Sequence, residues 1–160
     1  MHLLLKFGWD DLALELIKID EEFLDYTNII YQYPISYCID RIEIFSKILD
    51  IVYKKYPHQL NVIDSRSKTI ISHIVDKITN KSNDKYMTLF KKISDKIDYN
   101  LPEDRPVLIQ SIVTKKDKLA EYLINNSYGI NSHNRYQLFP IHALTEIINY
   151  DLLKKIINNK

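Results

Sequence analysis

Hydrophobic residues recur three and four positions apart along much of this chain, which is the spacing of one face of an α-helix. Residues 42–52, 119–124 and 152–157 each carry such a stripe. One short amphipathic helix cannot bury its apolar face alone, so these segments must pack against one another. Glycine occurs only at Gly8 and Gly129, which disfavours β architectures with many tight turns. The pattern therefore predicts an all-α fold.

Four segments begin with a similar step, in which an aromatic residue, Thr or Pro precedes an apolar helix. The first residues of these segments are Tyr33, Thr69, Pro106 and Phe139. Successive starts are 36, 37 and 33 residues apart, which indicates an internal repeat. Pro34 and Pro140 are expected to open helices, because Pro suits the first helical turn. Pro106 fits either the cap or the first helical position.

The segment 139–144, Phe-Pro-Ile-His-Ala-Leu, resembles the Thr-Pro-Leu-His-x-Ala step of the ankyrin-repeat family. That family places Asn eight residues and Asp five residues before the step, at the ends of a hairpin finger. Asn131 and Asn134 stand there before Phe139, and Asn61 and Asp64 before Thr69. The family's second helix is matched by the stripes at 119–124 and 152–157.

The resemblance covers essentially the whole chain and implies an ankyrin-repeat solenoid of stacked helix-turn-helix units with short hairpin fingers. A single domain, 1–160, would contain approximate repeats 1–24 (incomplete), 25–60, 61–99, 100–130 and 131–160. Two departures are visible: the link between helices around residues 78–85 is longer than the family norm, and the finger before Pro106 is about two residues short. The alternative is an irregular helical bundle built from the same amphipathic segments.

The first repeat raises a separate expectation. Gly8 matches the glycine that links the two helices of a repeat, so the first turn of this repeat would lie before Met1. We expect Leu3, Leu4 and Leu5 to be partly uncovered. They would then be covered either by further repeats of a longer array or by self-association through the incomplete N-terminal repeat.

The resemblance also assigns a role to one histidine. His142 stands at the signature His of the family, which ties adjacent repeats together through backbone hydrogen bonds. His2 would be the signature His of the first, incomplete repeat.

The charges and the candidate ligands exclude several kinds of chemistry. The chain has 22 basic and 21 acidic residues and a net charge of +1, with no block of five like charges, so we expect no nucleic-acid partner. Its five histidines and Cys38 do not have metal-ligand spacing, and we expect Cys38 to be buried and inert. Two glycines cannot build a phosphate-binding loop. The sequence thus predicts no catalytic residue, no cofactor and no metal.

Neither a signal peptide nor a membrane span is predicted, because the apolar run at Leu3–Leu5 is too short and no stretch of 18 apolar residues exists. We therefore expect no membrane partner and a location in the cytoplasm, or in the host cytosol for a secreted or viral protein. The abundance of Ile, Lys, Asn and Tyr is typical of an AT-rich genome, such as that of an intracellular bacterium or a large DNA virus.

The resemblance implies a protein–protein interaction module that binds another protein through its finger tips and the outward face of its first helices. The residues at those positions are Tyr31, Gln32, Tyr37, Arg66, Lys68, His73, Gln110, Arg135 and Tyr136, with Ala143 on the last first helix. A bacterial effector or viral host-interaction protein is the leading interpretation. An immunity or inhibitor protein that neutralises a cognate toxin or enzyme is the alternative, and a helical enzyme with an unrecognised site is a third.

Overall fold

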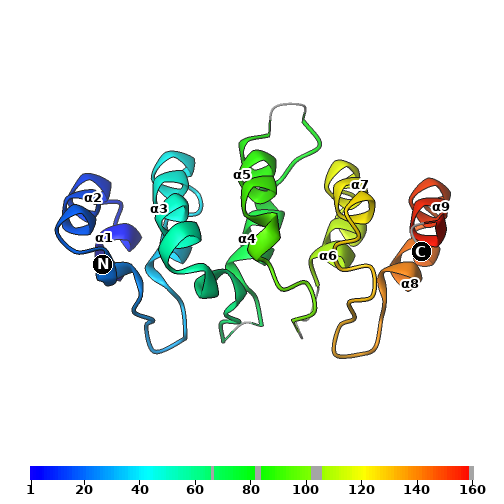
Figure 1. The fold of residues 1–160 in the computed structure, drawn as a ribbon, viewed down its shortest axis with the longest axis horizontal. Helices are drawn as coiled ribbons and strands as arrows, with labels where there is room; N and C mark the ends of the chain where they lie inside the picture. The colour runs from blue at the N-terminus through cyan, green and yellow to red at the C-terminus, as the bar shows by residue number, and fades with distance from the viewer. Residues whose placement is uncertain (66, 82–83, 102–105, 159–160) are drawn as a thin grey trace.

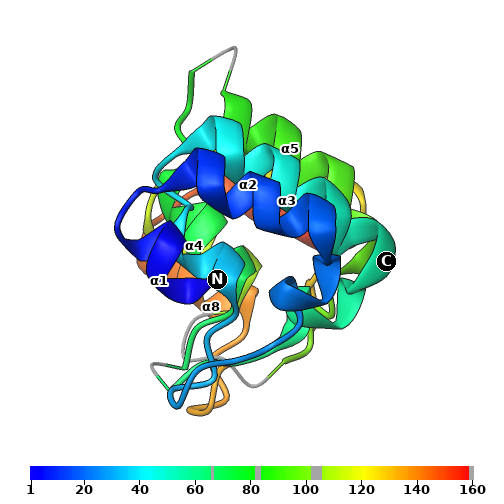
Figure 2. The same ribbon diagram turned by 90° about the vertical axis from the view of Figure 1, so that its left-hand side faces the viewer.

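The computed structural model describes residues 1–65, 67–81, 84–101 and 106–158. Within these residues the secondary structure consists of α-helices and short 3-10 helices, without strands. The helices form antiparallel pairs that stack side by side along the long axis of the molecule (Figure 1). Viewed along the stack, the second helices of the pairs form one layer and the first helices another (Figure 2).

Each pair combines a shorter first helix with a second helix. The pairs are α1 (His2–Lys6) with α2 (Asp10–Ile19), the 3-10 helix η2 (Pro34–Tyr37) with α3 (Ile42–Lys55), α4 (Ile70–Lys77) with α5 (Lys85–Ile93), α6 (Val107–Val113) with α7 (Asp117–Asn125), and α8 (Pro140–Glu146) with α9 (Tyr150–Asn158). Three further 3-10 turns, η1 (Glu21–Leu24), η3 (Pro57–Asn61) and η4 (Ser94–Lys96), follow the second helices of the first three pairs.

The first helices begin where the sequence predicts. Pro34 and Pro140 occupy the first turns of η2 and α8. Thr69 caps α4, because its side-chain oxygen accepts the N–H of Ser72 at 3.2 Å. Pro106 is the N-cap residue of α6, which resolves the two positions that the sequence left open.

Three of the links between paired helices have the same geometry. Their middle residues, Gly8, Lys115 and Ile148, have φ angles of 76°, 55° and 56°. In each link the following N–H donates to a carbonyl five residues earlier, at 2.9, 2.8 and 3.2 Å respectively. The link between α4 and α5 is longer, as expected, and begins with Ile78 in an extended conformation. These equivalences fix the register between the first, fourth and fifth pairs.

A continuous apolar core runs through the stack between the two helix layers. Phe45, Phe90, Ile74 and Leu123 are among its fully buried members. Cys38 is buried there, as expected, and burial raises the pKa of its thiol to about 12. No helix of the described residues has the length and apolar character needed to span a membrane.

The expectation for Leu3–Leu5 was correct only in part. Leu3 is 65% exposed and Leu4 is half-buried, but Leu5 is completely buried. The reason is that α1 packs against η2 of the next pair, and Arg41 Nη2 donates to the carbonyl of Leu5 at 2.5 Å. The side of α1 that faces the stack is therefore covered, and only its outer side is open.

Candidate protein-binding face

Three loops, which we call the fingers, project from one side of the stack, before η2, α4 and α8 (Figures 1 and 2). The fingers comprise residues 28–32, the described residues of 64–68 (64, 65, 67 and 68), and residues 134–138. In each, the backbone N–H of the first residue (Asn28, Asp64 or Asn134) donates to the carbonyl of the fifth, at 3.0, 2.9 and 3.2 Å. The side-chain oxygen of the same first residue accepts the N–H of the fifth, at 3.0, 3.2 and 3.1 Å.

This shared turn holds the fourth residue of every finger in the left-handed region. The φ angles of Tyr31, Ser67 and Gln137 are 58°, 57° and 60°. An L-residue adopts this conformation at some cost, which the local side-chain acceptor offsets by satisfying backbone N–H groups. The fingers are therefore built alike, and they differ in the side chains that they display.

Large apolar and aromatic side chains are exposed on the first and last fingers. Ile29 is 97% exposed, and Tyr31 and Tyr136 are 65% and 67% exposed. The guanidinium of Arg135 lies 5.0 Å from the ring centroid of Tyr136. Sequence reasoning identified Tyr31, Arg135 and Tyr136 as finger residues but missed Ile29. The signal for it was Asn28, which precedes the helix-opening step by the same five residues as Asp64 and Asn134.

Two residues expected on this face, Gln32 and Tyr37, also hold its elements together. Gln32 Nε2 donates to Asp64 Oδ2 at 3.0 Å, from one finger to the next. Tyr37 accepts a 2.8 Å hydrogen bond from Asn28 Nδ2 on its hydroxyl oxygen, and its ring packs edge-on against His2. Both side chains are half-buried, so they order the face as well as border it.

Lys68 and His73 lie beside the second finger. Lys68 Nζ is 3.1 Å from Asp76 Oδ2, in a pair that is about half exposed. His73 Nε2 is 3.9 Å from Asp64 Oδ2. Burial lowers the pKa of His73, and the positive charge of Lys68 lowers it further. Arg66 lies outside the described residues.

Gln110 and Ala143 were expected on the outward face but are buried. Gln110 is only 4% exposed, and its Nε2 donates to Asp76 Oδ1 at 2.6 Å and to the carbonyl of Ser72 at 3.2 Å. The helix that carries Gln110, α6, packs against α4 on one side and α8 on the other, so this position lies between helices. We therefore exclude Gln110 and Ala143 from the candidate face.

The resemblance places His2 and His142 at the same signature position, but the two side chains make different hydrogen bonds. His142 Nδ1 accepts the N–H of Phe139 at 3.1 Å, a bond within its own repeat that closes the first turn of α8. His2 Nε2 donates to the carbonyl of Gln32 at 2.9 Å, in the finger of the next repeat. The bond between repeats that was expected for His142 is thus observed for His2.

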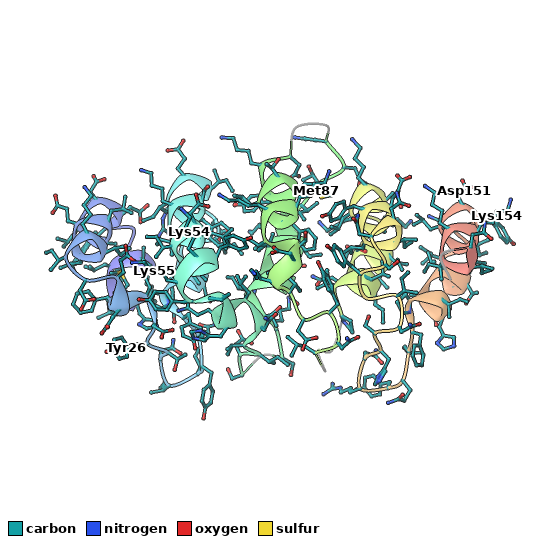
Figure 3. All side chains as sticks on the ribbon, viewed as in Figure 1. Tyr26, Lys54, Lys55, Met87, Asp151 and Lys154 are labelled. Atoms are coloured by element: carbon teal, nitrogen blue, oxygen red, sulfur yellow. The ribbon has the colours of Figure 1, made fainter. Side chains whose placement is uncertain are left out.

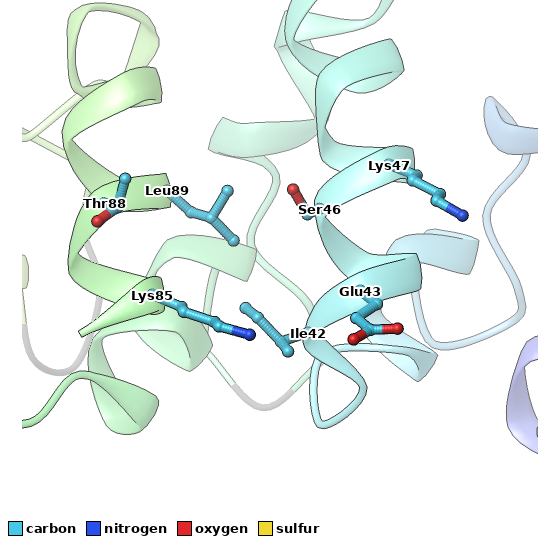
Figure 4. Close-up of a pocket in the computed structure, with 7 residues that line it drawn as sticks. All are labelled: Ile42, Glu43, Ser46, Lys47, Lys85, Thr88 and Leu89. Atoms are coloured by element: carbon cyan, nitrogen blue, oxygen red, sulfur yellow. The ribbon is translucent and has the colours of Figure 1, made fainter. Parts of the chain in front are cut away.

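A separate groove of about 640 Å³ lies between α3 and α5 (Figure 4). Its lining residues are Ile42, Glu43, Ser46, Lys47, Lys85, Thr88 and Leu89. This set contains no histidine or cysteine, and its charged side chains come from the exposed sides of both helices. Elsewhere in the described part of the chain, no three His, Cys, Asp or Glu side chains cluster as metal ligands would. The fingers therefore remain the better candidate site.

Comparisons with known proteins support this architecture. No protein-family model matches the chain, and no curated protein matches it in sequence. Among solved structures it is similar to the crystal structure of the ankyrin repeat domain of Bcl-3, described as a unique member of the IkappaB protein family. The TM-score is 0.68 at 12% identity, over 99% of this chain and 70% of that one. The fold of this chain is accordingly an ankyrin-repeat solenoid, as its repeated segments predict.

Proposed function

We propose that this chain is a non-enzymatic protein–protein interaction module whose partner binds to the finger face. We define the finger face as Ile29, Tyr31, Gln32, Tyr37, Lys68, His73, Arg135 and Tyr136, and we expect Arg66 to belong to it. The observation that carries the proposal is the exposure of Ile29, Tyr31 and Tyr136 on loops that backbone and side-chain hydrogen bonds hold in one turn. Such side chains are held ready for burial against a partner.

Apolar burial should supply most of the affinity. A large aromatic or aliphatic side chain that becomes fully buried contributes about 1.5–3 kcal/mol, and Tyr is enriched among the residues that dominate interfaces. The charge of Lys68 on this face is paired with Asp76 of the same chain. A partner gains little from competing for a charge that already has a counterion, so we expect Lys68 to contribute little to the salt dependence of binding.

The test compares three baits in affinity capture, followed by titration of the captured protein. The first bait is the unchanged chain, the second carries Tyr31→Ala with Tyr136→Ala, and the third carries Tyr150→Ala. Tyr150 is a matched control, because it is 66% exposed but lies on α9, outside the fingers. We expect the finger variant to lose more than about 2 kcal/mol of binding, roughly 30-fold in Kd, with its melting temperature nearly unchanged. Equal affinities for all three baits would move the binding site off the finger face.

The source of the captured protein distinguishes the finer roles. A bacterial effector or viral host-interaction protein, working in the host cytosol, should capture a host protein. An inhibitor of a cognate toxin or enzyme, working in its own cytoplasm, should capture a single protein of the source organism and abolish its activity. Capture from both lysates with the finger variant as a negative control separates these roles in one experiment.

A further inference from the structure

The last helix pair exposes side chains whose equivalents are buried in the pair before it. The shared link geometry relates each residue of α8–α9 to the residue 33 positions earlier in α6–α7. Ile157 is 52% exposed, whereas its equivalent Ile124 is completely buried. Ile141 is 39% exposed, whereas Leu108 is completely buried. In α6–α7, which another pair follows, these positions are buried. We call the set at the end of the stack the C-face, and it comprises Ile141, Thr145, Leu153 and Ile157.

The first helix pair exposes side chains on the opposite end of the stack, and their equivalents in α6–α7 are also buried. Each residue of α1–α2 is equivalent to the residue 107 positions later in α6–α7. Leu12 is 46% exposed, whereas its equivalent Leu119 is completely buried. Leu3 is 65% exposed, whereas Gln110 at the same position is buried. Leu4 and Leu16 are half-buried and likewise correspond to buried residues. We call Leu3, Leu4, Leu12 and Leu16 the N-face.

Inside the stack, α6 contacts α8 and α7 contacts α9. The helices that carry the positions equivalent to the C-face in one pair therefore pack against the helices that carry the positions equivalent to the N-face in the next. The two ends of the chain therefore carry the two halves of an interface that the chain already forms internally. We propose that the C-face of one copy docks on the N-face of a second copy and continues the solenoid head to tail.

Charge supports this register. The contact between α7 and α9 includes an ion pair between Glu121 and Lys155. The positions equivalent to this pair at the proposed junction are Lys154 on the C-face side and Glu15 on the N-face side, both of which are exposed. Lys154 extends from α9 beyond the last pair (Figure 3). The signs are reversed relative to the internal contact, but they remain opposite, so the docked copies would gain an ion pair and no repulsion.

A contact of this kind is heterologous, because each copy uses a different surface, and it leaves one face open at each end. The species formed should therefore lengthen as concentration rises rather than stop at a dimer. The contact does not use the finger face, so it stands or falls separately from the proposed partner binding.

Two variants that each block one face test the proposal by analytical ultracentrifugation. Leu12→Lys blocks the N-face and Ile157→Lys blocks the C-face, and both sites are well exposed, so the folded monomer should tolerate the changes. We expect the unchanged chain to elongate with concentration and each variant alone to be monomeric. An equimolar mixture of the variants should form a one-to-one dimer, because it retains one intact C-face and one intact N-face. Leu3→Lys and Ile141→Lys are the replacement pair if either first variant melts early.

Three outcomes would overturn the proposal. The first is that the unchanged chain stays monomeric throughout the high micromolar range. The second is self-association of the Ile157→Lys variant alone, which would indicate contact between two N-faces. The third is self-association of the Leu12→Lys variant alone, which would indicate contact between two C-faces.

Charge reversal then tests the register within the mixed dimer. Lys154→Glu in the partner that supplies the C-face, or Glu15→Lys in the partner that supplies the N-face, should each raise Kd about threefold, in line with exposed ion pairs. The two reversals together should restore it, because the charges are again opposite. Weakening by single reversals without restoration, or no change in any combination, would refute the register.

Discussion

The left-handed link at Ile148 provides a sharp test of the repeat register, because Gly8 occupies the equivalent position. Ile148 has a φ of 56° and is 66% exposed, so its side chain contributes little burial while its backbone is strained. The left-handed conformation costs an L-residue about 1–2 kcal/mol, and glycine removes that cost while losing about 0.5–1 kcal/mol of chain entropy. Ile148→Gly should therefore raise the free energy of unfolding by about 0.5–1 kcal/mol.

The assay is urea unfolding followed by far-ultraviolet circular dichroism, with Gly8→Ala as the matched control. For a slope near 2 kcal/mol/M, Ile148→Gly should raise the midpoint by roughly 0.4 M. Gly8→Ala should lower it by a similar amount, because a Cβ at Gly8 meets nothing within 4 Å and only the backbone term changes. A loss of stability in Ile148→Gly would indicate that this link is not left-handed, which would refute the register of α8–α9.

Three further predictions concern stability. Leu123→Ala, at a completely buried position of α7, should cost about 2–5 kcal/mol in urea unfolding, and a cost below 1 kcal/mol would refute the helix register. Asn61→Ala should cost about 1–3 kcal/mol in the same assay, because the Asn61 side chain bridges two repeats. It accepts the N–H of Asp98 at 2.8 Å and donates to the carbonyl of Lys96 at 2.9 Å, and no loss of stability would exclude that bridge. Burial lowers the pKa of His2 and His73 in the folded chain, so the unfolded chain binds more protons at low pH. The free energy of unfolding should therefore be constant above about pH 6.5 and fall below it, and this fall should be smaller in His73→Gln.

The repeat period and the helix starts could be predicted from the sequence because they depend on local chemistry. Pro34, Thr69 and Pro140 act at the first turn of a helix wherever it lies, so their positions carry the same meaning in every repeat. The long link after α4 was visible for the same reason, as an excess of residues between two apolar stripes. Local signals of this kind do not depend on how the repeats pack.

The membership of the binding face could be predicted less well, because exposure depends on the neighbouring repeats. Tyr37, His73 and Gln110 hold the same position in successive repeats, yet Gln110 alone of these three is buried. Its burial follows from the contacts of α6 with both α4 and α8, which no pattern along the chain encodes. Ile29 was missed because an apolar residue is expected in the core. Only the geometry of the finger shows that its side chain is exposed.

The strain in the fingers bears on the proposed role of Tyr31. A glycine at this position would adopt the left-handed conformation without cost, and the chain uses Tyr, whose ring is then largely exposed. A largely exposed ring gains little burial on folding and the strained backbone works against folding, so the stability of the chain alone does not explain this residue. Asn28 offsets part of the strain by accepting the N–H groups of Ile30 and Gln32, each at 3.0 Å. A strained backbone that local hydrogen bonds hold in place is typical of residues at functional sites. This strain supports Tyr31 as a partner-contacting residue beyond what its exposure alone indicates.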